Sequence, residues 1–301
     1  MPVIGLLSAT TVEADDAFRL AAFREGLKET GYIEGRNVAF EHRGADNHYD
    51  RLQTLATELV QSRVAVIVAF GATASALAAK AATSKIPVVF MIGSDPVKFG
   101  LVASLNQPGG NVTGVSLLSN LIVQKQFEVL KEAAPQADLI GLLVNPANPN
   151  AESDVREAQQ AAEALGRKLI VVRASTPGAL EAGFATLAGQ RVGALLVAAD
   201  PFFLSQIDPL ISLAARQRLP TLCPWRECAV AGGLLSYGAS VRDGHRLQGI
   251  YAGRILKGEK PSELPVQQAV KIEMVVNLKT AKALGMTIPD KLLTAVDDVI
   301  E

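Results

Sequence analysis

Two cysteines, Cys223 and Cys228, enclose the only tryptophan of the chain in the stretch CPWREC. A redox dithiol usually has the spacing Cys-x-x-Cys at the start of a helix, whereas four residues separate this pair. A zinc site would need two more ligands nearby, and the three histidines, His42, His48 and His245, lie at no metal-ligand spacing. We therefore expect neither redox nor metal chemistry, and no cofactor. We expect Cys223 to lie inside a strand and to face away from Cys228, which favours unlinked thiols that pack as small apolar groups. The spacing also permits a small disulfide loop in an oxidising compartment.

The composition is that of a globular protein with a good apolar core. The chain has 301 residues, which favours two domains, and it is 49% hydrophobic and 20% charged. Its 29 basic and 30 acidic residues leave a net charge of −1, so we do not expect a nucleic-acid partner. No apolar run reaches membrane-spanning length. The chain enters a strand almost at once, with no visible signal peptide or lipid-anchor cysteine, which leaves open a cytoplasmic protein or a mature chain without its leader.

Short apolar runs alternate with longer amphipathic runs, which predicts parallel sheets covered by helices on both faces. The predicted strands are 3–8, 37–42, 64–70, 87–92, 112–116, 139–144, 169–173, 194–198, 221–224 and 234–237. The predicted helices are 15–30, 49–62, 73–82, 121–134, 152–165, 177–188, 207–218 and 242–256, and a last strand and helix follow within 271–286.

The second half of the chain repeats the pattern of the first. VIGLLS (3–8) is similar to LIGLLV (139–144), VAVIVAFG (64–71) to VGALLVAA (192–199), and IPVVFMIGSD (86–95) to LPTLCPWREC (219–228). Three pairs in the same order, each offset by roughly 130 residues, predict a two-lobed pseudo-repeat. The fold class that we expect is α/β, with two doubly wound parallel-sheet lobes.

In an open parallel sheet, ligands bind beyond the carboxyl ends of the strands, so two facing lobes would hold a ligand in the cleft between them. Small and polar residues follow the predicted strands at SATT (8–11), FGATAS (70–75), GSDP (93–96), NPANPN (145–150), ADPFF (199–203) and PWREC (224–228). Gly71 and Thr73 open a helix, whose N-terminal N–H groups suit a carboxylate. Trp225 and Arg226 follow the predicted strand 221–224. The planar guanidinium of Arg226 could bind a carboxylate, and the ring face of Trp225 could contact an aromatic or cationic group.

Several longer stretches resemble one known family. SDPVKFGLVASLNQPGGNVTGVS (94–116), GGLLSYG (232–238), AGRILKGEKPSELPVQ (252–267) and VNLKTAKALG (276–285) resemble the solute-binding proteins of the tryptophan/tyrosine-type ABC transporters over nearly the whole chain. The resemblance implies a type I periplasmic-binding-protein fold with a three-crossover hinge. Lobe one would comprise 1–115 and 239–263, and lobe two 116–238 and 264–301.

The resemblance also implies function. A small organic ligand would be trapped as the lobes close and delivered unchanged to a membrane permease, by a monomeric periplasmic protein that performs no catalysis. Carried over by position, the pocket would use strand-end residues of both lobes. These are Ser8, Ala9, Thr10, Phe70, Gly71, Thr73, Ser94, Asp95, Asn145, Asp200 and Tyr237. Asp200 would suit a ligand ammonium or amide, Thr73 a carboxylate, and Phe70 and Trp225 an aromatic ring.

The stretch Pro224-Trp225-Arg226 departs from the pattern of the tryptophan-binding members, which carry small polar residues there. This departure favours an acidic ligand, such as an aromatic carboxylate without an amine. Two other functions remain open from the residues alone. A ligand-sensing domain of a regulator would need an effector segment, and a two-lobed α/β enzyme such as a racemase would place one thiol in each lobe. Nucleotide-binding and nucleophile-elbow motifs are absent from the sequence.

Overall fold

The chain folds into two compact units. The computed structural model describes residues 1–11, 18–117, 122–268 and 271–301. The first unit comprises residues 1–118 and 241–270, and the second 119–240 and 271–301, so the chain passes between them three times. We had expected residues 264–270 in the second lobe. They belong to the first unit because Thr113 Oγ1 donates to the Leu264 carbonyl and a short strand at Gln267–Gln268 pairs with the edge of the first sheet.

The first unit is built on a six-stranded, wholly parallel sheet with the order β11-β5-β4-β3-β1-β2. Its strands are β1 (Val3–Ser8), β2 (Ala39–Gly44), β3 (Val66–Phe70), β4 (Val88–Ile92), β5 (Val112–Ser116) and β11 (Gln267–Gln268). Its helices are α2 (Arg19–Glu29), α3 (Leu52–Gln61), α4 (Thr73–Ala82) and α11 (Val241–Leu256), with single 3-10 turns at Tyr49–Arg51 and Pro261–Glu263.

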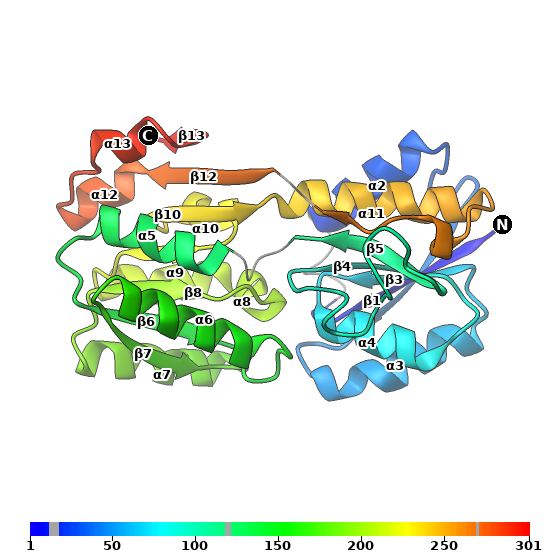
Figure 1. Cartoon of the computed structure of the whole chain (residues 1–301), viewed down its shortest axis with the longest axis horizontal. Coiled ribbons are helices and arrows are strands. Elements are labelled where there is room, and N and C mark those ends of the chain that lie inside the picture. Colours follow the sequence, from blue (N-terminus) through cyan, green and yellow to red (C-terminus); the bar gives the residue numbers. More distant parts are fainter. Residues whose placement is uncertain (12–17, 118–121, 269–270) are drawn as a thin grey trace. The chain divides into compact units, whose positions relative to one another are not determined.

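Both faces of this sheet are buried, because its strands place apolar side chains alternately on one face and the other. In β3, Val66, Val68 and Phe70 pack in the core with α2 and α11, whereas Ile67 and Ala69 pack in the core with α3 and α4. The two helix layers lie on opposite faces (Figure 1). Helices α2 and α11 approach so closely that a Cβ on Gly249 would lie 2.1 Å from the carbonyl oxygen of Phe23. The carboxyl end of β3 is therefore held against the N-terminal half of α11.

The second unit contains a seven-stranded sheet with the order β13-β12-β10-β9-β8-β6-β7. Its strands are β6 (Leu139–Val144), β7 (Lys168–Arg173), β8 (Ala194–Val197), β9 (Thr221–Cys223), β10 (Leu235–Ala239), β12 (Ile272–Asn277) and β13 (Asp298–Ile300). Only β10 and β12 pair in the antiparallel sense among these described strands. Its helices are α5 (Val123–Ala133), α6 (Ala151–Ala164), α7 (Pro177–Gly189), α8 (Pro201–Ser205), α9 (Ile207–Arg216), α10 (Arg226–Val230), α12 (Leu278–Leu284) and α13 (Asp290–Leu293).

The two sheets repeat one topology, as the sequence pairs predicted. Strands β2-β1-β3-β4-β5 of the first sheet and β7-β6-β8-β9-β10 of the second follow the same order. The strand that comes first along the chain in each set, β1 or β6, has a similar sequence, VIGLLS or LIGLLV. The α/β class with two parallel-sheet lobes is confirmed.

The long periodic elements are also confirmed, with ends that differ by a few residues. Residues 15–17 and 121 of two predicted helices lie outside the described residues. Three short helices, α8, α10 and α13, and the short strands β11 and β13 were not predicted. Helices α8 and α10 begin where loops were expected. Pro224, expected in a strand, lies beyond the end of β9. Helices of five residues give no periodic signal in a sequence, which explains the omission.

Candidate functional site

The carboxyl edge of the first sheet gathers four buried hydroxyl groups. Ser8, the last residue of β1, has its Oγ 3.0 Å from Oγ1 of Thr10, and the Thr10 amide donates to the same Ser8 oxygen. Thr73, the first residue of α4, has its Oγ1 2.9 Å from Oγ of Ser94 beyond β4. All four residues are at most 5% exposed. The edge therefore presents hydroxyls beside the N-terminus of a ten-residue helix, an arrangement suited to an anion.

Phe70 is the last residue of β3 at this edge, and Gly71 follows it. The Phe70 ring stacks on the His245 ring of α11, with centroids 4.2 Å apart, and it is 1% exposed. Gly71 has φ +75°, and a Cβ added there would lie 3.9 Å from Nη1 of Arg19 and 4.0 Å from Cε1 of His245. Phe70 is thus packed into the unit's own core, and a buried cation and an imidazole lie beside Gly71.

Hydrogen bonds fix the tautomer of His245. Gln248 Nε2 donates to the carbonyls of Ala69 and Val89, so its Oε1 is the acceptor that faces His245 Nδ1 at 3.0 Å. His245 Nδ1 must then carry the proton, which leaves Nε2 as an acceptor. Complete burial, and secondarily the charge of Arg19, lowers the pKa of His245 to about 3. The imidazole is therefore neutral at physiological pH.

The remaining predicted residues of the first unit have local structural roles. Ala9 is buried, and its carbonyl accepts from the Asn47 amide. Asp95 is exposed, and its Oδ1 accepts from the amides of Val97 and Lys98, which stabilises the turn after β4. Asp95 and Asp200 lie in different units.

In the second unit, Asp200 organises the carboxyl edge. It is 2% exposed and caps α8, with Oδ1 accepting from the Phe202 amide and from Nδ2 of Asn145. Its Oδ2 accepts from Nδ2 of Asn148 at 2.8 Å. Asn145 Oδ1 in turn accepts a hydrogen bond from the Ala147 amide, and this bond shapes the loop between β6 and α6. Asp200 thus holds both loops of this edge together while remaining a buried carboxylate.

Asp154, in the first turn of α6, adds a second buried acid to this edge. It is 8% exposed, and within the described part of the chain no hydrogen bond or ion pair reaches its carboxylate. Burial, and then the charges of Glu157 and Asp200, raises the pKa of Asp154 to about 7. Asp154 therefore binds a proton in the folded protein at pH values where an ordinary aspartate is ionised.

Tyr237 lies in the middle of β10 and is partly exposed. Its carbonyl accepts from Nε2 of Gln126 at 2.8 Å, which ties the strand to α5. Its ring packs against the core that α5 and α6 share with the sheet.

For CPWREC, the structure shows the less favoured of the two possible states of the cysteines. Cys223 and Cys228 form a disulfide with Cα atoms 6.0 Å apart, because α10 begins at Arg226 and turns Cys228 back toward the end of β9. Trp225 is the N-cap of α10 and is 7% exposed. Arg226 pairs with Asp298 of β13, and the guanidinium lowers the pKa of that carboxyl. Arg226 thus has an internal partner, which removes the reason for preferring an amine-free acidic ligand.

Removal of this disulfide is expected to cost moderate stability. Replacing both cysteines by alanine should lower the free energy of unfolding by about 2 kcal/mol, the value expected for releasing a loop of this size. Urea unfolding of the variant and the wild type measures the difference. Two reactive thiols in the denatured, unreduced wild type would contradict the disulfide.

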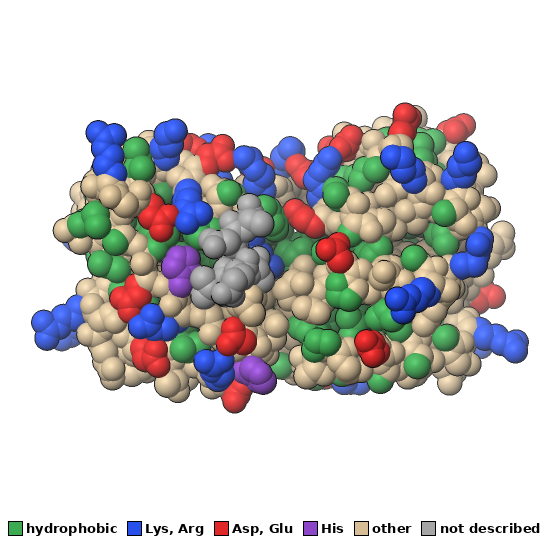
Figure 2. Space-filling view, turned by 180° about the vertical axis from the view of Figure 1, so that it is seen from behind, with side chains coloured by type: hydrophobic (Ala, Val, Ile, Leu, Met, Phe, Trp, Pro, Cys, Tyr) green, Lys and Arg blue, Asp and Glu red, His purple; other side chains and the backbone are tan. Residues whose placement is uncertain are grey.

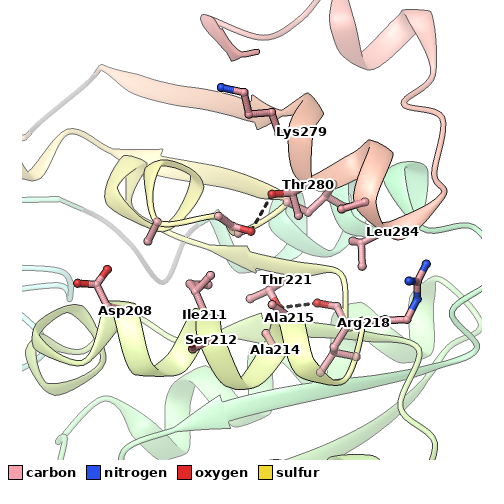
Figure 3. A pocket seen from close by; sticks show the side chains of 16 residues that line it. Asp208, Ile211, Ser212, Ala214, Ala215, Arg218, Thr221, Lys279, Thr280 and Leu284 are labelled. Carbon is pink, nitrogen blue, oxygen red and sulfur yellow. Dashed lines mark hydrogen bonds between the residues drawn. The ribbon is translucent and has the colours of Figure 1, made fainter.

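A groove of about 680 Å³ lies elsewhere on the second unit. It lies between α9 and α12, beside the amino ends of β9 and β10, with Asp208, Arg218 and Lys279 at its rim (Figure 3). Two of its hydroxyls are occupied, since Thr280 donates to the Gly232 carbonyl and Thr221 to the Leu219 carbonyl. Charged side chains of both signs are interspersed over the face in Figure 2. None of the predicted site residues lines this groove.

Among the described residues, no group of three or more His, Cys, Asp or Glu side chains is placed to hold a metal ion. No helix in that part of the chain is long and apolar enough to cross a membrane.

The structure brings together Ser8, Thr10, Thr73 and Ser94 at the carboxyl edge of the first sheet. It brings Asn145 and Asp200 together at the carboxyl edge of the second sheet. Sequence reasoning missed Arg19, His245, Asn148 and Asp154. In the sequence, His245 was considered only as a possible metal ligand, and its spacing to Gln248 on one helix face was the only available signal of its role.

Comparison with known proteins gives a consistent result. The family model described as ABC transporter substrate binding protein matches residues 10–300. A tyrosine-binding protein of Clostridioides difficile (strain R20291) is 28% identical over 264 residues, covering 88% of this chain and 75% of the relative. A conserved domain protein from Vibrio cholerae has 29% identity and a TM-score of 0.90, with 99% of each chain covered.

The structure of an ABC domain in complex with L-Trp from Streptococcus pneumonia has 27% identity to this chain and a TM-score of 0.87, with 99% of each chain covered. Solute-binding proteins with 13% identity share the fold alone, at TM-scores of 0.64 and 0.61. The type I periplasmic-binding-protein fold is thereby confirmed.

Proposed function

Because the chain belongs to the family of ABC transporter substrate-binding proteins, we propose that it is the extracytoplasmic receptor of an importer for an aromatic amino acid. The ligand would bind at the carboxyl edge of the first sheet and pass to a membrane permease. The supporting comparisons are the tyrosine-binding relative and the L-Trp complex. We further propose a periplasmic location for the mature chain, which would act as a monomer.

The observation that carries the proposal is the edge of the first sheet. Thr73 and Ser94 place two buried hydroxyls at the N-terminus of α4, and Arg19 adds a buried cation nearby. This set is complementary to the carboxylate that every free amino acid carries.

We propose no catalytic role. The disulfide occupies both cysteines, so the two-thiol racemase mechanism has no nucleophile in this protein. The residues Asp95 and Asp200 are engaged as turn and helix caps. A receptor should release its ligand unchanged, and chiral chromatography of L-tryptophan after prolonged incubation with the protein would detect racemisation.

A thermal-shift screen tests the proposed ligand class. Ligand-free protein would be screened against L-tryptophan, L-tyrosine, aromatic acids without an amine, nucleobases and sugars. A ligand at about 100 times its dissociation constant adds roughly 2.7 kcal/mol of stability, which gives a clear shift. We expect the largest shift with an aromatic amino acid. A shift confined to sugars or nucleobases would contradict the proposal.

A further inference from the structure

His245 presents a buried hydrogen-bond acceptor that the fold itself does not use. The residue is fully buried, and its Nε2 has no hydrogen-bond partner among the residues that the structure describes. The two strand carbonyls that bind the Gln248 amide fix the direction of that amide, which leaves only the acceptor role for Nε2. An unpaired buried polar atom is costly, so a native structure that keeps one calls for an explanation.

The surroundings of this atom indicate what could pair with it. His245 Cε1, the carbon bonded to Nε2, and Arg19 Nη1 both lie about 4 Å from the position that a Gly71 Cβ would occupy. Gly71 precedes Ala72, the N-cap of α4, and the N-terminus of this helix favours negative charge. A cation, a helix N-terminus and a neutral acceptor thus meet beside one residue that has no side chain.

We propose that His245 is a specificity-determining residue, whose Nε2 accepts a hydrogen bond from the α-amino group of an amino acid while Arg19 and the N-terminus of α4 hold its carboxylate. This inference rests on the proposed function and deepens it. A ligand that has the carboxylate but lacks the adjacent donor would leave Nε2 unpaired, and that penalty is the source of the discrimination.

Isothermal titration of two matched ligands tests the contact. L-tryptophan and indole-3-propionic acid differ only in the amino group. We expect the wild type to bind L-tryptophan at least tenfold more tightly. His245→Asn keeps an amide donor for Gln248 and removes the Nε2 acceptor. This variant should bind L-tryptophan about tenfold or more weakly than the wild type, and its affinity for indole-3-propionic acid should be nearly unchanged. His48→Asn, at an exposed histidine of the same unit, should change neither.

Nitrogen-15 NMR of the histidine rings supplies a readout that a merely structural role would not move. In ligand-free protein, His245 should be the Nδ1–H tautomer, and L-tryptophan should shift its unprotonated Nε2 resonance. The inference would be overturned by an Nε2–H tautomer, or by an Nε2 resonance that does not shift when L-tryptophan binds. It would also be overturned if His245→Asn lost affinity equally for L-tryptophan and indole-3-propionic acid.

Failure of the proposed function has a different signature. In that case neither L-tryptophan nor L-tyrosine would bind the folded wild type. The inference would then fall with the proposed function, even if the tautomer were as expected.

Discussion

Replacing Asp154 by asparagine is expected to raise the free energy of unfolding at pH 8 by about 2–4 kcal/mol and to change it little at pH 4. The wild-type carboxyl is buried beside Glu157 and Asp200, and this environment opposes its ionisation. At pH 8 the folded protein must hold a charge there that the unfolded chain exposes to water. Asparagine keeps the shape of the side chain without that charge.

The direction of the pH dependence follows from proton binding. The pKa of Asp154 is about 7 in the folded protein and 3.8 in an ordinary environment, so between these values the folded state binds more protons than the unfolded state. Wild-type stability should therefore fall as pH rises from 4 to 7, by up to about 4 kcal/mol from this group. The measurement is urea unfolding of both proteins from pH 4 to pH 8.

A matched control separates this effect from a general loss of negative charge. Glu181→Gln removes an exposed carboxylate on α7 of the same unit and should leave the stability difference across this pH range unchanged. Parallel stability curves for Asp154→Asn and the wild type would contradict the assignment of a raised pKa to Asp154.

His245 produces the opposite pH dependence on the acid side. Its pKa is lowered from 6.5 to about 3 by burial and by Arg19, so below pH 6.5 the unfolded chain takes up a proton that the folded protein excludes. Stability should decline as pH falls, by up to about 1.4 kcal/mol per pH unit, or about 3 kcal/mol between pH 6.5 and pH 4. His245→Asn has no titrating group there and should lose this decline.

The informative quantity is the slope of the unfolding free energy against pH below 6.5. Absolute stability is less informative, because the asparagine variant also loses packing against Phe70. Subtracting its curve from that of the wild type isolates the contribution of the imidazole. His48→Asn serves again as the control and should retain the wild-type slope. A wild-type slope in His245→Asn would show that the folded protein protonates this histidine at ordinary pH.

Much of the fold could be predicted because hydrophobic periodicity records burial directly. The alternation in β3 places Val66 and Val68 on one face and Ile67 on the other, and each face meets a helix layer. The strand ends predicted the edge residues Thr73 and Ser94 for the same reason, since a strand's length fixes where its last residue lies.

The contacts that give the candidate site its character could not be predicted in this way. Gln248 reaches carbonyls 179 and 159 residues away in the chain, and this tertiary contact determines the state of His245. The disulfide in CPWREC could not be predicted from periodicity, because α10 has only five residues and gives no periodic signal. This helix turns Cys228 back toward Cys223. The partner of Arg226 is 72 residues away, so its ion pair could not be read from local sequence.

A crystal structure of the protein with L-tryptophan tests the central claim most directly. The account predicts one molecule at the carboxyl edge of the first sheet, with its carboxylate against Thr73 and the N-terminus of α4 and its amino group within hydrogen-bond distance of His245 Nε2. Well-defined density for the ligand only in the groove between α9 and α12, or contacts that leave the carboxylate away from α4, would contradict it.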